Sequence, residues 1–373
     1  MSRVLGATLV GLVLAAPAWA HHGFGRFDPT KKVTLEGTLT GIDFVNPHAY
    51  MYFDQTTADG KVIKMRCEMR AATVLRRSGW TPEMFVPGKH VVINGNPHRD
   101  DPSSCYIEDL TIGDAPTLKR YEQLTTATPT APKDRPARTA WGELNLAGDW
   151  AQEQYLIARA PQGSRGGLVP KSQVAAVEAG TVKVEDLPQN GWGARPVTFT
   201  PAGQAAADAL RAKPPSDNAR SRCEITSVLF DWVFDGPINR ITQTKDAITM
   251  EYGRGLKRTI HMNLKTHPAN VTPSRAGHSI GRWEGDTLVV DTVGFAPGTI
   301  AGNVSNDVKL HVLERFSLDP KTLALRRDYE AEDPTYFTDK YAGYDIVMPA
   351  DAPYAEDKCE ELTYRDYSKE NAK

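Results

Sequence analysis

Apolar and polar residues alternate along most of the chain, and this period of two predicts a mainly β protein. In the first third, turn signals such as Asp59-Gly60, a good hairpin dipeptide, separate the alternating runs. The predicted elements there are strands 33–44, 49–55 and 62–68, a helix over 71–78, and strands 89–94 and 105–112. Three strands, a helix and two strands are the order of a small OB-like five-stranded barrel. A small sandwich of the same strands is the alternative.

The second half of the chain repeats short β-favouring runs at regular spacing, after an opening Gly148-Asp149-Trp150 that is typical of a first barrel strand. So many strands joined by tight turns predict a larger antiparallel up-and-down, lipocalin-like barrel. The predicted strands are 228–234, 239–244, 247–252, 258–263, 278–284, 287–295, 308–318, 323–329 and 360–367. Because a barrel of about eight strands can hold one small ligand, its interior is the default binding site.

One hairpin carries the densest mixture of β-formers and reactive side chains. Gly285-Asp286 predicts a two-residue turn, with Gly where a positive φ is needed, which places Trp283 opposite Leu288. Residues opposed in this register share a face of the sheet. One face then carries Trp283, Leu288 and Val290, and the other carries His278, Ile280, Arg282, Val289 and Asp291. The first face is the predicted core.

Asp291 lies diagonally across from both His278 and Arg282 in this register. A carboxylate beside an imidazole can fix the tautomer, raise the basicity and relay a proton. These residue types therefore predict an acid–base pair of His278 and Asp291, with Arg282 binding the ligand. The alternative is an exposed ion cluster on a solvated sheet face, where such pairs contribute little.

Glu314 shares the apolar face of its predicted strand with Val312 and Phe316. An unpaired buried carboxylate is costly, so it either binds a cation, titrates upward and serves as a general acid or base, or pairs with an arginine. Arg282 and Arg315 are the expected partners. The further ligand-binding candidates on the barrel strands are Trp232, Tyr252, His261 and His311. His267, in a loop before Pro268, is a weaker indication of a site.

The 373 residues leave room for two domains. A stretch rich in Pro, Thr and Ala from Thr125 to Ala140 has no apolar period and predicts a linker. The predicted organisation is a signal peptide 1–20, an OB-like domain 21–118, a linker 119–140, and a β-barrel domain 141–373 that contains an irregular segment 161–222. In that segment Thr200-Pro201 predicts the N-cap and first residue of a helix.

The first twenty residues have the pattern of a secretory signal peptide. Arg3 precedes an apolar run, and Ala18-Trp19-Ala20 fits the cleavage site, which leaves His21 as the mature start. No later stretch approaches the ~20 apolar residues of a transmembrane helix, so no stable membrane insertion is expected. The predicted location is periplasmic or secreted. A formal net charge of −2 offers no basic field for nucleic acid.

Four cysteines suit an oxidising compartment. Of three pairings, we favour Cys67–Cys105 and Cys223–Cys359, one in each half of the chain. The string Gly277-His278-Ser279-Ile280-Gly281 has the spacing of Gly-x-Ser-x-Gly, but it leads into a predicted strand and not a helix, so a serine hydrolase is disfavoured. The sequence contains neither a His-Glu-x-x-His motif nor a dinucleotide fingerprint, and no cofactor is required.

The mature N-terminus would bring a free α-amine and an imidazole together at His21. With a further imidazole from His22, His48 or His98, this nitrogen set suits Cu(II). Copper binding is therefore one hypothesis. Against it, N-terminal residues are usually mobile, and His48 and His98 both follow a Pro in a turn.

Two stretches resemble known protein groups. The mature start His21-His22-Gly23-Phe24, with Asn46-Pro47-His48-Ala49 and Leu75-Arg76-Arg77-Ser78-Gly79-Trp80, resembles a family of uncharacterised exported bacterial domains that begin His-His-Ser-Phe. Gly23 replaces the Ser of that pattern. The stretch from Gly277 to Phe295, with Leu310–Phe316 and Glu332-Asp333-Pro334, resembles uncharacterised secreted β-proteins. These resemblances imply export and β architecture, and no activity.

Two classes of function follow from these observations. The first is an exported binding protein that holds a small, partly apolar molecule in the C-terminal barrel, oriented by His278, Arg282, Asp291 and Glu314. The second is a cofactor-free lyase, isomerase or hydratase that uses a His278/Asp291 pair or Glu314 for proton transfer.

Overall fold

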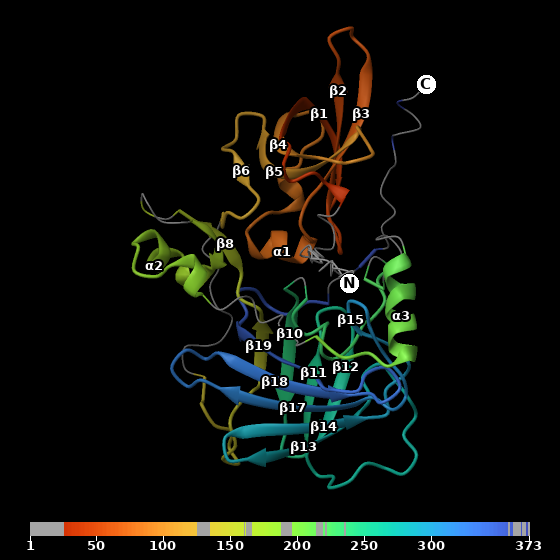
Figure 1. Cartoon of the computed structure of the whole chain (residues 1–373). Coiled ribbons are helices and arrows are strands. Elements are labelled where there is room, and N and C mark those ends of the chain that lie inside the picture. Colours follow the sequence, from red (N-terminus) through yellow and green to blue (C-terminus); the bar gives the residue numbers. More distant parts are fainter. Residues whose placement is uncertain are drawn as a thin grey trace, which may run out of the picture.

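The computed structural model shows two β-barrels, one above the other in Figure 1, with the helices at their margins. The residues that it describes are 26–124, 135–159, 161, 166–187, 196–213, 219–220, 222–234, 236–356, 359–360, 367 and 371. Among these, no helix is both long and apolar enough to cross a membrane.

The N-terminal barrel has the predicted order of elements. They are β1 (Val33–Asp43), β2 (Tyr50–Thr56), β3 (Val62–Glu68), α1 (Ala72–Arg77), the 3-10 turn η2 (Pro82–Met84), β4 (His90–Pro97), β5 (Ser104–Ile112) and the short β6 (Leu118–Lys119). The strand order β3-β2-β1-β4-β5 closes through a parallel pairing of β3 with β5. The OB-like five-stranded barrel is therefore confirmed.

A disulfide fastens this closure. Cys67 of β3 and Cys105 of β5 are register partners, with Cα atoms 4.5 Å apart, and their sulfurs are bonded. Side chains such as Met51, Phe53 and Trp80 fill the interior and are at most 1% exposed. The alternation in β2 and β3 thus places one face of each strand in this core.

The C-terminal barrel is closed and has nine strands in the order β10-β11-β12-β13-β14-β17-β18-β19-β7. Its strands are β7 (Gly148–Ala151), β10 (Ile238–Gln243), β11 (Ala247–Glu251), β12 (Lys257–His261), β13 (His278–Glu284), β14 (Thr287–Val293), β17 (His311–Leu318), β18 (Leu325–Glu332) and β19 (Tyr341–Pro349). The sequence did not predict β19. The predicted strand 360–367 lies largely outside the described residues.

The up-and-down prediction is wrong at one place, because β12 and β13 pair in parallel. The loop 262–277 between them carries the chain back to the end at which β12 begins. A parallel pair needs such a long connection, whereas every tight turn gives an antiparallel pair.

The predicted strand 228–234 is also wrong, because this segment forms helical turns. Ser227 Oγ accepts hydrogen bonds from the backbone N–H groups of Leu229 and Phe230 at 3.2 and 3.1 Å, and Asp231 N donates to Ser227 O at 3.0 Å. The run 228–234 is apolar except for Asp231 and has no period of two that would separate a strand from buried helical turns. Trp232 is fully buried against the barrel core.

Smaller elements decorate the barrels. They are β8 (Tyr155–Ala158), β9 (Gly167–Pro170), η3 (Lys171–Gln173), α2 (Val174–Glu178), η4 (Val184–Asp186), α3 (Pro201–Ala212), β15 (Gly298–Ala301) and β16 (Val304–Asn306). The predicted start of α3 is confirmed, since Thr200 Oγ1 accepts a hydrogen bond from Gly203 N at 3.0 Å.

The two barrels meet at the end of α1. Arg77 Nε lies 2.6 Å from Asp351 Oδ1, and its Nη atoms donate to the carbonyl oxygens of Gly236 and Gln152. The second predicted disulfide, Cys223–Cys359, is also present, and Glu360 N donates to Asn46 O of the N-terminal barrel. Both disulfides fit an oxidising compartment.

Candidate functional site

The hairpin of β13 and β14 has the predicted register. Glu284 pairs with Thr287, Trp283 with Leu288 and Ile280 with Asp291. Gly285 begins the turn at a φ of +61°. Trp283 is partly buried against the core as predicted, so the side chains of His278 and Asp291 point to the outer face of the barrel.

Asp291 is the centre of a histidine cluster on this outer face. Its Oδ1 lies 3.1 Å from Nε2 of His267 and 3.0 Å from Nε2 of His311. The exposed fractions of these side chains, 30% for Asp291, 18% for His267 and 42% for His311, leave the group accessible to a ligand. We call this group, with His278 and His261, the Asp291 cluster.

Two further imidazoles extend the Asp291 cluster along the sheet. Nδ1 of His278 lies 2.9 Å from Nδ1 of His267, and the rings of His278 and His261 stack with their centroids 4.9 Å apart. Five elements contribute these residues: the end of β12, the loop 262–277, the start of β13 and the neighbouring strands β14 and β17. The parallel pairing of β12 and β13 brings His261 beside His278.

The hydrogen bonds fix the proton positions when His267 is neutral. Its Nε2–H donates to Asp291, so its Nδ1 carries a lone pair that accepts the Nδ1–H of His278. Nε2 of His278 then carries a lone pair that can take a proton. Burial, followed by the neighbouring His261 and His267, lowers the pKa of His278, so this imidazole is neutral near pH 7 and its Nε2 lone pair is free to accept a proton.

Arg282 does not join the Asp291 cluster. Its Nε and Nη2 donate to Glu284 Oε1 at 3.0 and 2.7 Å, and Arg315 donates to the other oxygen of the same carboxylate at 2.9 Å. All three side chains are exposed on the outer face. The predicted ligand-binding role of Arg282 remains a prediction, but its partner is Glu284 and not Asp291.

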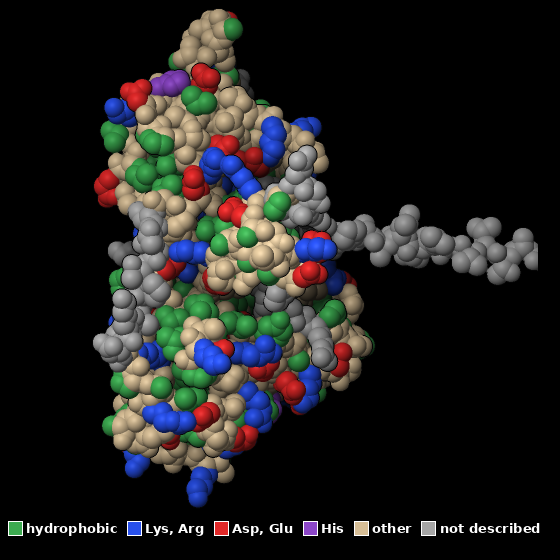
Figure 2. All heavy atoms as spheres, turned by 90° about the vertical axis from the view of Figure 1, so that its left-hand side faces the viewer, with side chains coloured by type: hydrophobic (Ala, Val, Ile, Leu, Met, Phe, Trp, Pro, Cys, Tyr) green, Lys and Arg blue, Asp and Glu red, His purple; other side chains and the backbone are tan. Residues whose placement is uncertain are grey.

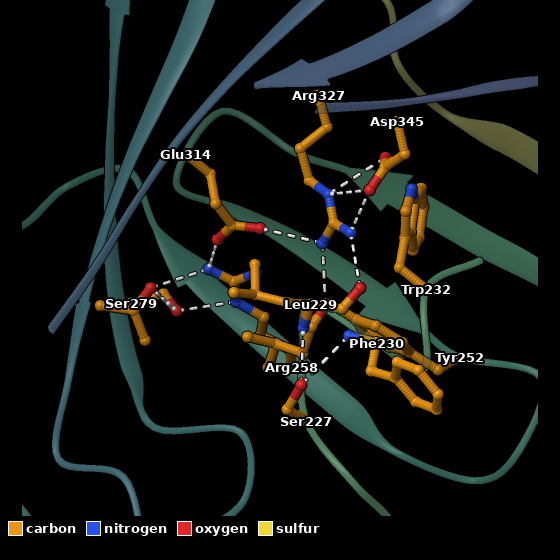
Figure 3. Close-up of polar contacts among 12 residues, drawn as sticks. Ser227, Leu229, Phe230, Trp232, Tyr252, Arg258, Ser279, Glu314, Arg327 and Asp345 are labelled. Atoms are coloured by element: carbon orange, nitrogen blue, oxygen red, sulfur yellow. Dashed lines mark hydrogen bonds and ion pairs between the residues drawn. The ribbon is translucent and has the colours of Figure 1, made fainter. Parts of the chain in front are cut away.

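Glu314 points to the opposite side of the same sheet, into the barrel. Figure 3 shows its carboxylate between the guanidinium groups of Arg258 and Arg327. The predicted pairing with Arg282 or Arg315 is therefore wrong, because Arg282 on β13 and Arg315 on β17 both point to the outer face. Burial acts to raise the pKa of Glu314, but the two arginines hold it below its ordinary value.

The rest of the interior is equally crowded. Arg327 binds Asp345 through Nη2 at 2.5 Å and donates to the carbonyl oxygens of Val228 and Leu229 at 2.8 Å each. Burial raises the pKa of Asp345 to about 6 against the opposing effect of its single arginine. Trp232 and Tyr252 pack edge to face at 5.4 Å beside this network and are fully buried.

The predicted site residues therefore form two groups. His278, Asp291, His261 and His311 lie together on the outer face, whereas Glu314, Trp232 and Tyr252 lie in the barrel interior, where the turn segment 222–234 fills space that a ligand would need. Sequence analysis treated His267 as a weaker indication of a site, but its side chain connects Asp291 to His278. It also missed Arg258 and Arg327, whose only signal was their inward parity on predicted strands.

The copper hypothesis depends on His21 and on further imidazoles from His22, His48 or His98. His21 and His22 lie outside the described residues. His48 Nδ1 lies 2.5 Å from Glu68 Oε1, and His98 Nδ1 accepts hydrogen bonds from the N–H groups of Asp100 and Asp101. Within the part of the chain that the structure describes, no three His, Cys, Asp or Glu side chains are arranged to hold a metal ion.

Comparison with known proteins yields one match. The model of a family of unknown function, DUF6152, matches residues 10–105, which is less than half of the chain and reaches the start of β5. No curated protein and no solved structure matches the chain. The N-terminal region is therefore similar to a family without an assigned function, in line with the resemblance of its mature start and helix motif.

Proposed function

We propose that this chain is an exported protein that catalyses proton transfer on a small molecule at the Asp291 cluster, as a lyase, isomerase or hydratase does. The observation that carries the proposal is the chain of hydrogen bonds from His278 through His267 to Asp291. A neutral imidazole that is hydrogen-bonded to a second imidazole, which in turn donates to a carboxylate, can take a proton and pass the positive charge along this chain of hydrogen bonds toward the carboxylate.

The crowded barrel interior supports an outer-face site. Arg258, Arg327 and Glu314 are at most 1% exposed and pair with one another, so they serve as core and leave the accessible imidazoles as the reactive groups. Figure 2 shows acidic and basic side chains interleaved over the face that it presents, without a broad area of one sign. The formal net charge of −2 likewise favours a small molecule over a polyanion as the ligand.

The proposal can be tested without knowing the substrate, because the lone pair of a neutral imidazole attacks p-nitrophenyl acetate, releases p-nitrophenolate and passes the acetyl group to water. We expect the intact protein to accelerate this cleavage and His278→Gln to lose most of the rate, by about tenfold or more. Asp291→Asn should lower it as well, since an amide donates to His267 and reverses the tautomer. The matched control is His90→Gln, an exposed histidine on the N-terminal barrel. Cleavage that His278→Gln leaves unchanged would contradict the proposal.

Export is the second part of the proposal and has its own test. The mass of the protein recovered from the exported fraction should correspond to a chain that starts at His21, because cleavage is expected after Ala20. A chain in that fraction that retains Met1 would contradict cleavage at this position.

A further inference from the structure

A hollow of about 600 Å³ lies on the outer face of β17, β18 and β19. Its lining residues are Leu313, Arg315, Arg326, Asp328, Tyr329, Glu330, Ala342, Gly343 and Tyr344. This volume is within the range of ~300–1,000 Å³ that is usual for small-molecule sites. Ala342 and Gly343 carry almost no side chain, so the middle of β19 leaves the space open.

The hollow adjoins the Asp291 cluster. Asp291 pairs with Leu313, Leu313 with Glu330, and Glu330 with Ala342, so one row of outward side chains crosses four strands from the cluster into the hollow. Neighbouring strands lie about 4.8 Å apart, which places Leu313, at the edge of the hollow, one strand from Asp291. A ligand in the hollow can therefore reach the imidazole of His311, which lies two residues from Leu313 on β17.

The polar groups of the hollow are held in fixed planes. Arg326 donates from Nε and Nη2 to the two oxygens of Asp328 at 2.8 and 2.6 Å, and its guanidinium lies 4.0 Å from the centroid of the Tyr344 ring. Arg315 donates one hydrogen bond to Glu284, a carboxylate that it shares with Arg282. Arg326 is thus paired with a carboxylate of its own, while the remaining N–H donors of both arginines and the carboxylate lone pairs stay within reach of a ligand.

We infer that this hollow binds a saccharide, which is the substrate class of the proton-transfer site. Paired donors and acceptors held side by side match the adjacent hydroxyl groups of a sugar, each of which donates and accepts. The ring of Tyr344 offers an apolar face on which sugar C–H groups can pack, and its hydroxyl offers a polar group at the tip. Two arginines and two carboxylates, Asp328 and Glu330, line the hollow, so their formal charges balance and a ligand need not be charged to bind. This inference rests on the proposed function only for the reaction and not for binding.

The test is saturation-transfer NMR with five trisaccharides: cellotriose, maltotriose, xylotriose, chitotriose and trigalacturonate. We expect at least one of them to bind the intact protein. Arg326→Ala should weaken that binding by about tenfold or more, because it removes charge-assisted hydrogen bonds. Ala342→Phe, which fills the hollow and removes no charge, should abolish it. The matched control is Arg138→Ala, an exposed arginine in a similar two-bond pair with Asp286 on the same barrel.

Each outcome has a defined meaning. Binding that falls in Arg326→Ala and Ala342→Phe and persists in Arg138→Ala supports the inference. Absence of binding by all five sugars, or binding that the two hollow variants leave unchanged, overturns it. Cleavage of p-nitrophenyl acetate is unaffected by either result, so failure of the saccharide inference is distinguishable from failure of the proton-transfer proposal. A preference for trigalacturonate would show an acidic sugar, and a preference for the others a neutral one.

Discussion

Asp291 and Glu314 show how one residue of register decides the role of a carboxylate. Glu314 pairs with Val290 and points into the barrel, while Asp291 pairs with Leu313 and points outward. Side chains alternate between the faces of a sheet, so the two carboxylates lie on opposite sides of the same pair of strands. The inward one meets arginines and no solvent, and the outward one meets accessible imidazoles.

The buried position makes Glu314 essential for stability. Substituting Glu314→Gln leaves Arg258 and Arg327 with less compensating charge in the core, and breaking a buried pair in this way costs about 3–5 kcal/mol. Urea unfolding of Glu314→Gln should show this loss. Glu284→Gln, which breaks two exposed pairs to arginine on the same sheet, should cost far less. Equal losses in the two variants would show that the buried network contributes no more to the free energy of unfolding than the exposed ion pairs do.

The lowered pKa of His278 gives a pH dependence of known sign. Between its lowered folded pKa and the ordinary value of 6.5, the unfolded chain takes up a proton at His278 and the folded chain does not. Stability is therefore lost as the pH falls below about 6.5. Urea midpoints between about pH 7 and pH 5 should fall more in the wild type than in His278→Gln. An identical fall in both would contradict the assignment, as would an NMR titration midpoint for His278 above 6.5.

At the scale of elements, the β13–β14 hairpin depends on its turn. Gly285 has a φ of +61°, and a Cβ added there would meet nothing within 4 Å. The cost of a side chain is therefore conformational and not steric. Gly285→Val should destabilise the protein by about 1–2 kcal/mol in urea unfolding, and Gly285→Asn by less, because Asn tolerates the left-handed region. A larger loss in the Asn variant than in the Val variant would refute this explanation.

The local pattern of apolar and polar residues predicted the strands in which the two types alternate. It failed for segments without such alternation. The register from Glu284 to Asp291 and the α3 cap at Thr200 follow from nearest-neighbour chemistry, and both are confirmed. The segment 228–234 is apolar except for Asp231 and has no period that predicts a strand or a helix. The Asp291 cluster was only half foreseen, because His267 reaches Asp291 through the long loop that makes β12 and β13 parallel. Such a contact depends on the closure of the barrel and leaves no trace in local spacing.

At the scale of the whole molecule, a group of largely buried polar contacts connects the two barrels. Arg77 closes α1 in the N-terminal barrel and binds Asp351, just after β19 of the other barrel. Gln154 adds hydrogen bonds to Arg77 O and to Asp351 at 2.9 and 2.7 Å. Arg77 is 6% exposed, so these bonds are shielded from water and hold the two barrels in a fixed orientation.

The matched pair Arg77→Ala and Arg76→Ala tests this coupling, since the two arginines are neighbours in the last turn of α1. We expect calorimetry to show one unfolding transition for the intact protein. Arg77→Ala removes the partner of a largely buried carboxylate, at a cost of about 3 kcal/mol, and should split the transition in two as the barrels unfold separately. Arg76 is exposed and its guanidinium lies over the Phe44 ring of the same barrel, so we expect Arg76→Ala to keep a single transition. A single, unshifted transition in Arg77→Ala would mean that the orientation of the barrels is held elsewhere, with the Cys223–Cys359 segment beside Asn46 as the next contact to sever.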